Sequence, residues 1–81
     1  MITRSITVSK NPAIERLGAA RFVDCANRYS SSVLLVDGNY KINAKSLLGV
    51  IAMELGGGKT ISLVADGADE LESLDALCAL L

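Results

Sequence analysis

The chain has 81 residues, of which 51% are apolar and 21% are charged, and its net charge is −1. This composition suits one folded domain over residues 1–81 and excludes a disordered chain, while no apolar stretch approaches the ~20 residues of a membrane span. Lysine, arginine and aromatic residues do not cluster as a nucleic-acid surface requires, so we expect a cytoplasmic protein that contacts neither nucleic acid nor membrane.

The first third of the chain has the pattern of a strand followed by a helix. Apolar residues and Arg4 alternate with serine and threonine over residues 2–9, which predicts a half-buried strand. Asn11-Pro12-Ala13 ends this pattern, and apolar residues then recur at helical spacing over about residues 15–28. The apolar positions of this helix are Ala19, Phe22, Val23, Ala26 and Tyr29.

A hairpin and a short helix are predicted next. Residues 32–36 and 40–42 have strand composition, and Asp37-Gly38-Asn39 between them tolerates the positive φ angles of a tight turn. Ser46 is suited to cap a helix from Leu47 to about Leu55, which should end at the glycine run of residues 56–58.

The last third predicts a strand over residues 60–65 and a final helix. The helix should bury one stripe of residues and carry acids near its start, where the helix dipole favours negative charge. The stripe comprises Leu71, Leu74, Leu77, Cys78 and Leu81, and the acids are Asp69, Glu70 and Glu72. The order is β-α-β-β-α-β-α, an α+β class with helices grouped on one face of an antiparallel sheet.

Three features that resemble binding sites are better explained structurally. Gly56-Gly57-Gly58-Lys59-Thr60 lacks the first glycine of a phosphate-binding loop and joins a helix to a strand, the reverse of that motif. The acids near residue 69 lack the spacing of a calcium loop. Cys25 and Cys78 are expected to be reduced and mostly buried, and without histidine they cannot complete a usual zinc site. We therefore expect no cofactor and no metal.

Three segments resemble the HPr family, the histidine phosphocarriers of the bacterial sugar phosphotransferase system. Residues 43–50, N-A-K-S-L-L-G-V, are similar to the family segment N-A-K-S-I-M-G-V. Residues 65–70, followed by Leu74 and Leu77, resemble the family's ending, and residues 18–23 resemble its first helix. The resemblance spans nearly the whole chain and implies an open-faced β-sandwich, with a four-stranded antiparallel sheet in the order 1-4-2-3 and three helices on one face.

The chain departs from this family at the phosphocarrier position. The family motif H-A-R-P carries the phosphorylated histidine, whereas this sequence has Glu15-Arg16-Leu17-Gly18 and contains no histidine. Neutral imidazole is a nucleophile near neutral pH, and a carboxylate with an apolar neighbour at residue 17 is a poor substitute. Glu15 either imitates phosphohistidine permanently or merely favours the helix dipole, and we favour the second interpretation.

Ser46 has two interpretations. Sequence physics alone favours a simple helix cap, worth about 1 kcal/mol. The resemblance instead implies phosphorylation by HPr kinase/phosphorylase and binding of the phosphoserine form to a LacI-type catabolite repressor, as in Crh, a family member without the active histidine. The chain looks Crh-like, although Crh keeps the arginine and proline that Leu17 and Gly18 replace here.

The sequence therefore predicts a non-catalytic regulatory protein of the phosphotransferase system. Ser46 would be its switch, and other proteins of the system are further possible partners implied by the resemblance. The expected partner-binding residues are Glu15, Arg16, Leu17, Lys45, Leu47, Leu48 and Ile51. A binding module that has lost both phosphorylations is the alternative, and an enzyme is not expected because no nucleophile and base, cofactor loop or metal set is present.

Overall fold

The computed structural model describes residues 1–8, 16–53 and 58–81; for Arg16 and Leu17 it describes the backbone only. Within these ranges the chain forms four strands and three helices in the predicted order. Their bounds are β1 (Ile2–Thr7), α1 (Arg16–Asn27), β2 (Ser32–Asp37), β3 (Tyr40–Asn43), α2 (Leu47–Met53), β4 (Thr60–Asp66) and α3 (Glu70–Leu80).

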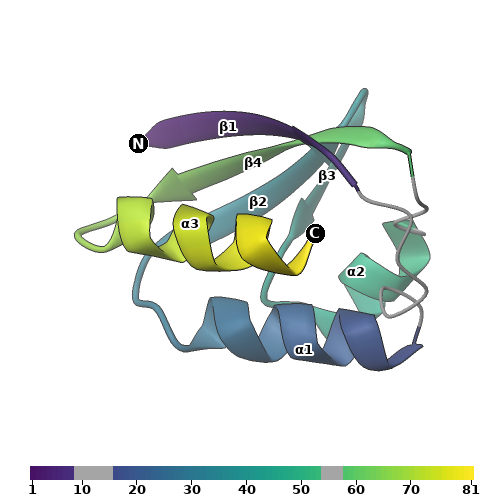
Figure 1. The fold of residues 1–81 in the computed structure, drawn as a ribbon, viewed down its shortest axis with the longest axis horizontal. Helices are drawn as coiled ribbons and strands as arrows, with labels where there is room; N and C mark the ends of the chain where they lie inside the picture. Colours follow the sequence, from purple (N-terminus) through teal and green to yellow (C-terminus); the bar gives the residue numbers. More distant parts are fainter. Residues whose placement is uncertain (9–15, 54–57) are drawn as a thin grey trace.

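The strands form one sheet in the order β1-β4-β2-β3. Each neighbouring pair is antiparallel, and β4 lies in the middle of the sheet because it pairs with both β1 and β2. The three helices cover one face of this sheet and leave the other face open (Figure 1). The prediction of an open-faced sandwich with sheet order 1-4-2-3 is confirmed.

The core lies between the sheet and the helices, and the alternating strand pattern explains it. Every second residue of β4 points toward the helices, because successive side chains of a strand face opposite sides. The helices supply the other half of the core, α1 and α3 through one apolar stripe each and α2 through Val50 and Met53. The fully buried members of these rows include Ile61, Leu63 and Ala65 of β4, Val33 and Leu35 of β2, Phe22 and Ala26 of α1, and Leu74 and Leu77 of α3.

The predicted element bounds agree with the structure to within one or two residues. The first helix begins at Arg16 and ends at Asn27, so Tyr29 follows it, and the hairpin turn is Gly38-Asn39 with Gly38 at φ 58°. The expected end of the second helix near residue 55 and the break at residues 11–13 lie outside the described residues. Asp24 and Arg28, four residues apart at the end of α1, form an exposed ion pair of 3.2 Å.

Two predictions about burial need correction. Leu71 is 53% exposed and does not belong to the buried stripe of α3, because the face that α3 turns toward the core is centred on Ser73, Leu74 and Leu77. Cys25 and Cys78 are free, as predicted, but each is half-buried instead of mostly buried. None of the helices in the described ranges is long and apolar enough to cross a membrane.

Asp69 lies at the start of α3, as predicted, and it also has a contact that the sequence did not indicate. Asp69 precedes α3, but its side chain makes no capping hydrogen bond to that helix. Its carboxylate instead accepts hydrogen bonds from the backbone amides of Ser30 and Ser31, each 2.9 Å long, and from the Ser31 hydroxyl. Asp69 therefore ties the start of α3 to the segment before β2, a contact that local helix rules could not foresee.

Candidate functional site

The segment before α2 presents Ser46 at the start of the helix. Ala44 is fully buried, and its amide donates to the Val33 carbonyl at 2.9 Å, which anchors the segment to β2. The Asn43 side-chain oxygen accepts the Lys45 amide at 2.9 Å, and the Asn43 carbonyl accepts the Ser46 amide at 3.0 Å. These bonds turn the chain out of β3 and direct it into α2.

Ser46 is an exposed helix cap, as predicted. Its hydroxyl oxygen accepts the Gly49 amide at 3.3 Å, and its carbonyl accepts the Val50 amide at 3.0 Å. The side chain is nevertheless exposed to solvent, so another protein can reach the hydroxyl. A buried hydroxyl would have ruled out its modification in the folded protein.

Three apolar side chains beside Ser46 are exposed and form what we call the α2 patch: Leu47, Leu48 and Ile51. Their exposed fractions are 43%, 82% and 48%. Val50 and Met53, on the opposite side of the helix, are buried in the core. The structure thus brings Ser46 and three of the predicted partner-binding residues together on one surface. A cluster of large exposed apolar residues is typical of a surface that contacts another protein.

Lys45 has a contact that the sequence did not reveal. Its ammonium donates a hydrogen bond of 2.8 Å to the Tyr29 carbonyl, just after α1, and the side chain is half-buried. The Asn27 amide group contacts the Lys45 carbonyl at 3.4 Å and the Val23 carbonyl at 2.9 Å. Lys45 therefore joins α1 to the start of α2, and this contact gives it a structural role whether or not it contacts a partner.

Two of the remaining predicted site residues lie at the start of α1. Arg16 and Leu17 occupy its first turn, and α1 packs against α2, as Figure 1 shows. Their side chains are not among those described, and Glu15 lies outside the described residues. Their predicted contacts with partners therefore remain predictions.

The described residues also contain a pocket that the sequence did not indicate. It lies near Lys59, whose ammonium forms an ion pair of 2.7 Å with Asp37. The only sequence feature near this pocket was the glycine run before Lys59. It resembled a phosphate-binding loop, an interpretation rejected on the sequence alone. That rejection agrees with the structure, because Lys59 leads into β4 and not into a helix. Within residues 1–8, 16–53 and 58–81, no group of three or more His, Cys, Asp or Glu side chains could hold a metal ion.

The structure is thus an open-faced sandwich with this strand order and an exposed serine at the start of its second helix. The family model of the PTS HPr component phosphorylation site matches residues 2–81 of the chain. The chain belongs to the HPr family. This match covers nearly the whole sequence and confirms the resemblance drawn from residues 43–50.

Individual relatives show the same family. The chain is 35% identical to the HPr-like protein Crh of Halalkalibacterium halodurans over 79 residues, covering 98% of this chain and 94% of the relative. It is 35% identical to the phosphocarrier protein HPr of Treponema pallidum over 77 residues, or 95% and 88% of the two chains. The crystal structure of HPr from Bacillus anthracis superposes with a TM-score of 0.92 at 32% identity, covering 99% of this chain and 95% of that one.

These matches place the chain among proteins of the phosphotransferase system and its catabolite control. At the level of the family, its relatives are phosphocarriers and not enzymes. Members of the family work by contacting other proteins of the system. Both phosphocarrier HPr proteins and Crh proteins are among the relatives. The particular role of this chain therefore has to be argued from its own residues.

Proposed function

We propose that this protein is a non-catalytic regulatory member of the HPr family, switched by phosphorylation at Ser46 and acting through the α2 patch. One observation carries the proposal: Ser46 is exposed beside Leu47, Leu48 and Ile51 in a chain without histidine. The serine supplies a place for regulation, and the absent imidazole removes the group that carries phosphate in the family's transfer reaction.

The absence of histidine supports a role other than phosphate relay. A phosphohistidine cannot form on a chain that contains no histidine. Glu15 has one charge and two oxygens where a phosphoryl group has more charge and three oxygens. We propose that the charge of Glu15 favours the dipole of the helix that follows it in the sequence, and that Glu15 does not carry phosphate.

Phosphorylation of Ser46 would change the character of the α2 patch. A phosphoserine adds about −1.5 to −2 charges at pH 7 and three strong acceptor oxygens. Leu47 follows directly in sequence, and Leu48 is the most exposed member of the patch. A partner surface with apolar groups next to arginine or lysine would then bind the phosphorylated form better than the unmodified form.

The partners we propose are HPr kinase/phosphorylase and a LacI-type catabolite repressor. Support comes from the N-A-K-S segment at residues 43–46 and from the two Crh proteins among the similar sequences. The kinase would modify Ser46, and the repressor would bind the phosphorylated protein. Lys45 is the weakest of the proposed contact residues, because its ammonium already binds the Tyr29 carbonyl.

Phosphorylation is tested by incubating the protein with HPr kinase/phosphorylase and ATP, followed by mass spectrometry. We expect one added phosphate, located at Ser46 by fragmentation. The Ser46→Ala variant should gain none, and the matched Ser32→Ala variant, which removes an exposed serine from β2, should be modified like the wild type. An unmodified wild-type protein would reject the switch.

A second function is favoured by the residues that follow Glu15. Leu17 and Gly18 stand where the family motif has arginine and proline, which removes groups that contact partners in the family. In this alternative the chain has lost both phosphorylations and binds another protein through the same face. A pull-down that recovers the same partners with Ser46→Ala as with phosphorylated wild type would favour this function over the first.

A further inference from the structure

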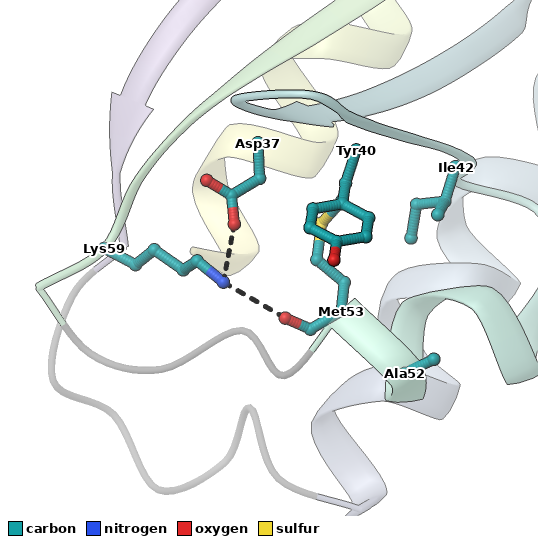
Figure 2. Close-up of a pocket in the computed structure, with 6 residues that line it drawn as sticks. All are labelled: Asp37, Tyr40, Ile42, Ala52, Met53 and Lys59. Atoms are coloured by element: carbon teal, nitrogen blue, oxygen red, sulfur yellow. Dashed lines mark hydrogen bonds and ion pairs between the residues drawn. The ribbon is translucent and has the colours of Figure 1, made fainter.

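A pocket of about 340 Å³ opens beside the end of α2 and has no role in the function proposed above. Its walls come from the β2–β3 hairpin, from α2 and from the residue that precedes β4, which are three separate parts of the chain. It is lined by Asp37, Tyr40, Ile42, Ala52, Met53 and Lys59. Figure 2 shows Lys59 and Asp37 on one side of the pocket and Tyr40 and Ile42 on the other.

One side of the pocket offers a hydrogen-bond donor next to an acceptor. The Lys59 ammonium has three N–H donors, of which one contacts Asp37 Oδ2 at 2.7 Å and one the Met53 carbonyl at 3.2 Å. Within the described residues the third donor and Asp37 Oδ1 have no other partner. This polar side carries no net charge, so it does not select for an anion or a cation.

The remaining walls are apolar and lie next to the α2 patch. Ala52 is exposed and stands four residues after Leu48, so both side chains lie on the same face of α2. Tyr40 is 73% exposed on the other side of the opening. The exposed apolar surface of α2 therefore runs from the patch to the mouth of the pocket, which Tyr40 also lines.

We propose that the pocket receives one large apolar side chain from an extended peptide segment of a partner protein. The side chain would pack against Ile42, Met53 and the Tyr40 ring. Removal of these apolar surfaces from water would favour binding. A peptide group beside it offers one N–H and one C=O, which match the free acceptor of Asp37 and the free donor of Lys59. The inference rests on the proposed function only in that the protein acts by binding other proteins.

Other occupants fit the pocket less well. A phosphate or carboxylate would gain no net attraction, because the Lys59 ammonium is already paired with the Asp37 carboxylate. A polyol would satisfy the polar side but leave the apolar groups of four of the six lining residues without apolar contact. An apolar side chain with its own peptide group satisfies both halves of the pocket.

The probes are two blocked tripeptides, acetyl-Gly-Leu-Gly-amide and acetyl-Gly-Ala-Gly-amide, titrated into the full chain and followed by two-dimensional amide NMR. We expect saturable shifts at the amides of Tyr40, Ile42, Ala52 and Lys59, with the leucine peptide binding on the order of tenfold more tightly than the alanine peptide. Equal binding of the two peptides, or shifts located elsewhere on the protein, would overturn the proposal.

Two variants test the location. Ala52→Trp should fill the mouth and weaken binding of the leucine peptide at least about tenfold, whereas Ala79→Trp, at an exposed position on α3, should leave it unchanged. Tyr40→Ala removes a wall from an exposed position and should weaken the same peptide several-fold. Unchanged binding in both pocket variants would refute the assignment. Ser46→Ala should bind the peptide like wild type, so failure of the switch and failure of the pocket are separate results.

Discussion

Asp69 and Ser31 are joined by two hydrogen bonds although they are 38 positions apart in the sequence. One Asp69 oxygen accepts both the amide and the hydroxyl of Ser31, and the other accepts the Ser30 amide. These donors stabilise the charged carboxylate and lower the pKa of Asp69 from 3.8 to about 2. The contact fixes the start of α3 to the start of β2 and makes the fold sensitive to acid.

The stability of the protein should fall in acid through Asp69. Because the pKa of Asp69 is lower in the folded than in the unfolded protein, its stabilisation is complete above about pH 5 and is lost as the pH falls toward 2. Glu70 acts in the same direction, since its contacts with the Met1 ammonium and the Gly67 amide lower its pKa. Urea unfolding between pH 6 and pH 2 measures this dependence.

The Asp69→Asn variant isolates that contribution. It should be less stable than wild type at pH 6, and its free energy of unfolding should depend less on pH between 5 and 2. The remaining slope should shrink further when Glu70→Gln is added. A wild-type slope that persists unchanged in Asp69→Asn would contradict the role given to this carboxylate.

Gly67 should be far less tolerant of substitution than Gly38. Gly67 has φ 155°, and a Cβ atom there would lie 2.7 Å from the Ser31 Cα, so an alanine clashes with backbone. Gly38 has φ 58° but open space around it. We expect Gly67→Ala to lower the free energy of unfolding by at least about 2 kcal/mol and Gly38→Ala by about 1 kcal/mol. Similar urea midpoints for the two variants would be inconsistent with this packing.

The elements themselves could be predicted from the sequence because their signals are local. Strand alternation over residues 2–8, the Gly38-Asn39 turn and the helical spacing of α1 each depend on near neighbours. The capping contact of Ser46 is equally local, since the Ser46 hydroxyl oxygen accepts a hydrogen bond from the amide of Gly49, three residues later. The sheet order came from the resemblance to a family and not from these patterns.

The contacts that build the sites could not be predicted in this way. Lys59 meets Asp37 only because β4 pairs with β2, which brings residues 22 positions apart together. Lys45 reaches Tyr29 only because α2 begins beside the end of α1. No local pattern marks either pairing, so the pocket and the anchoring of Lys45 were both missed. Leu71 was wrongly assigned to the buried face of α3 for a related reason. Helical spacing identifies a row of apolar residues, but it does not show at which residue that row stops contacting the core.

Replacing Lys45 by methionine tests its structural role. The variant keeps most of the side-chain length but loses the bond to the Tyr29 carbonyl, and we expect it to lower the free energy of unfolding by about 1 kcal/mol. The matched Lys41→Met variant, on the exposed edge strand β3, should change it by less than about 0.5 kcal/mol. Equal stability of the two variants would show that the Lys45 contact contributes nothing in solution.

Leu48 should matter for binding and not for folding. Because Leu48 is 82% exposed, Leu48→Ala should unfold at the wild-type urea concentration. If the α2 patch binds the proposed repressor, the same change in Ser46-phosphorylated protein should weaken binding on the order of tenfold, measured by fluorescence anisotropy. Leu71→Ala, which removes an exposed leucine from α3, is the control and should bind within about twofold of wild type. Equal affinities of Leu48→Ala and Leu71→Ala for the repressor would contradict an interface on α2.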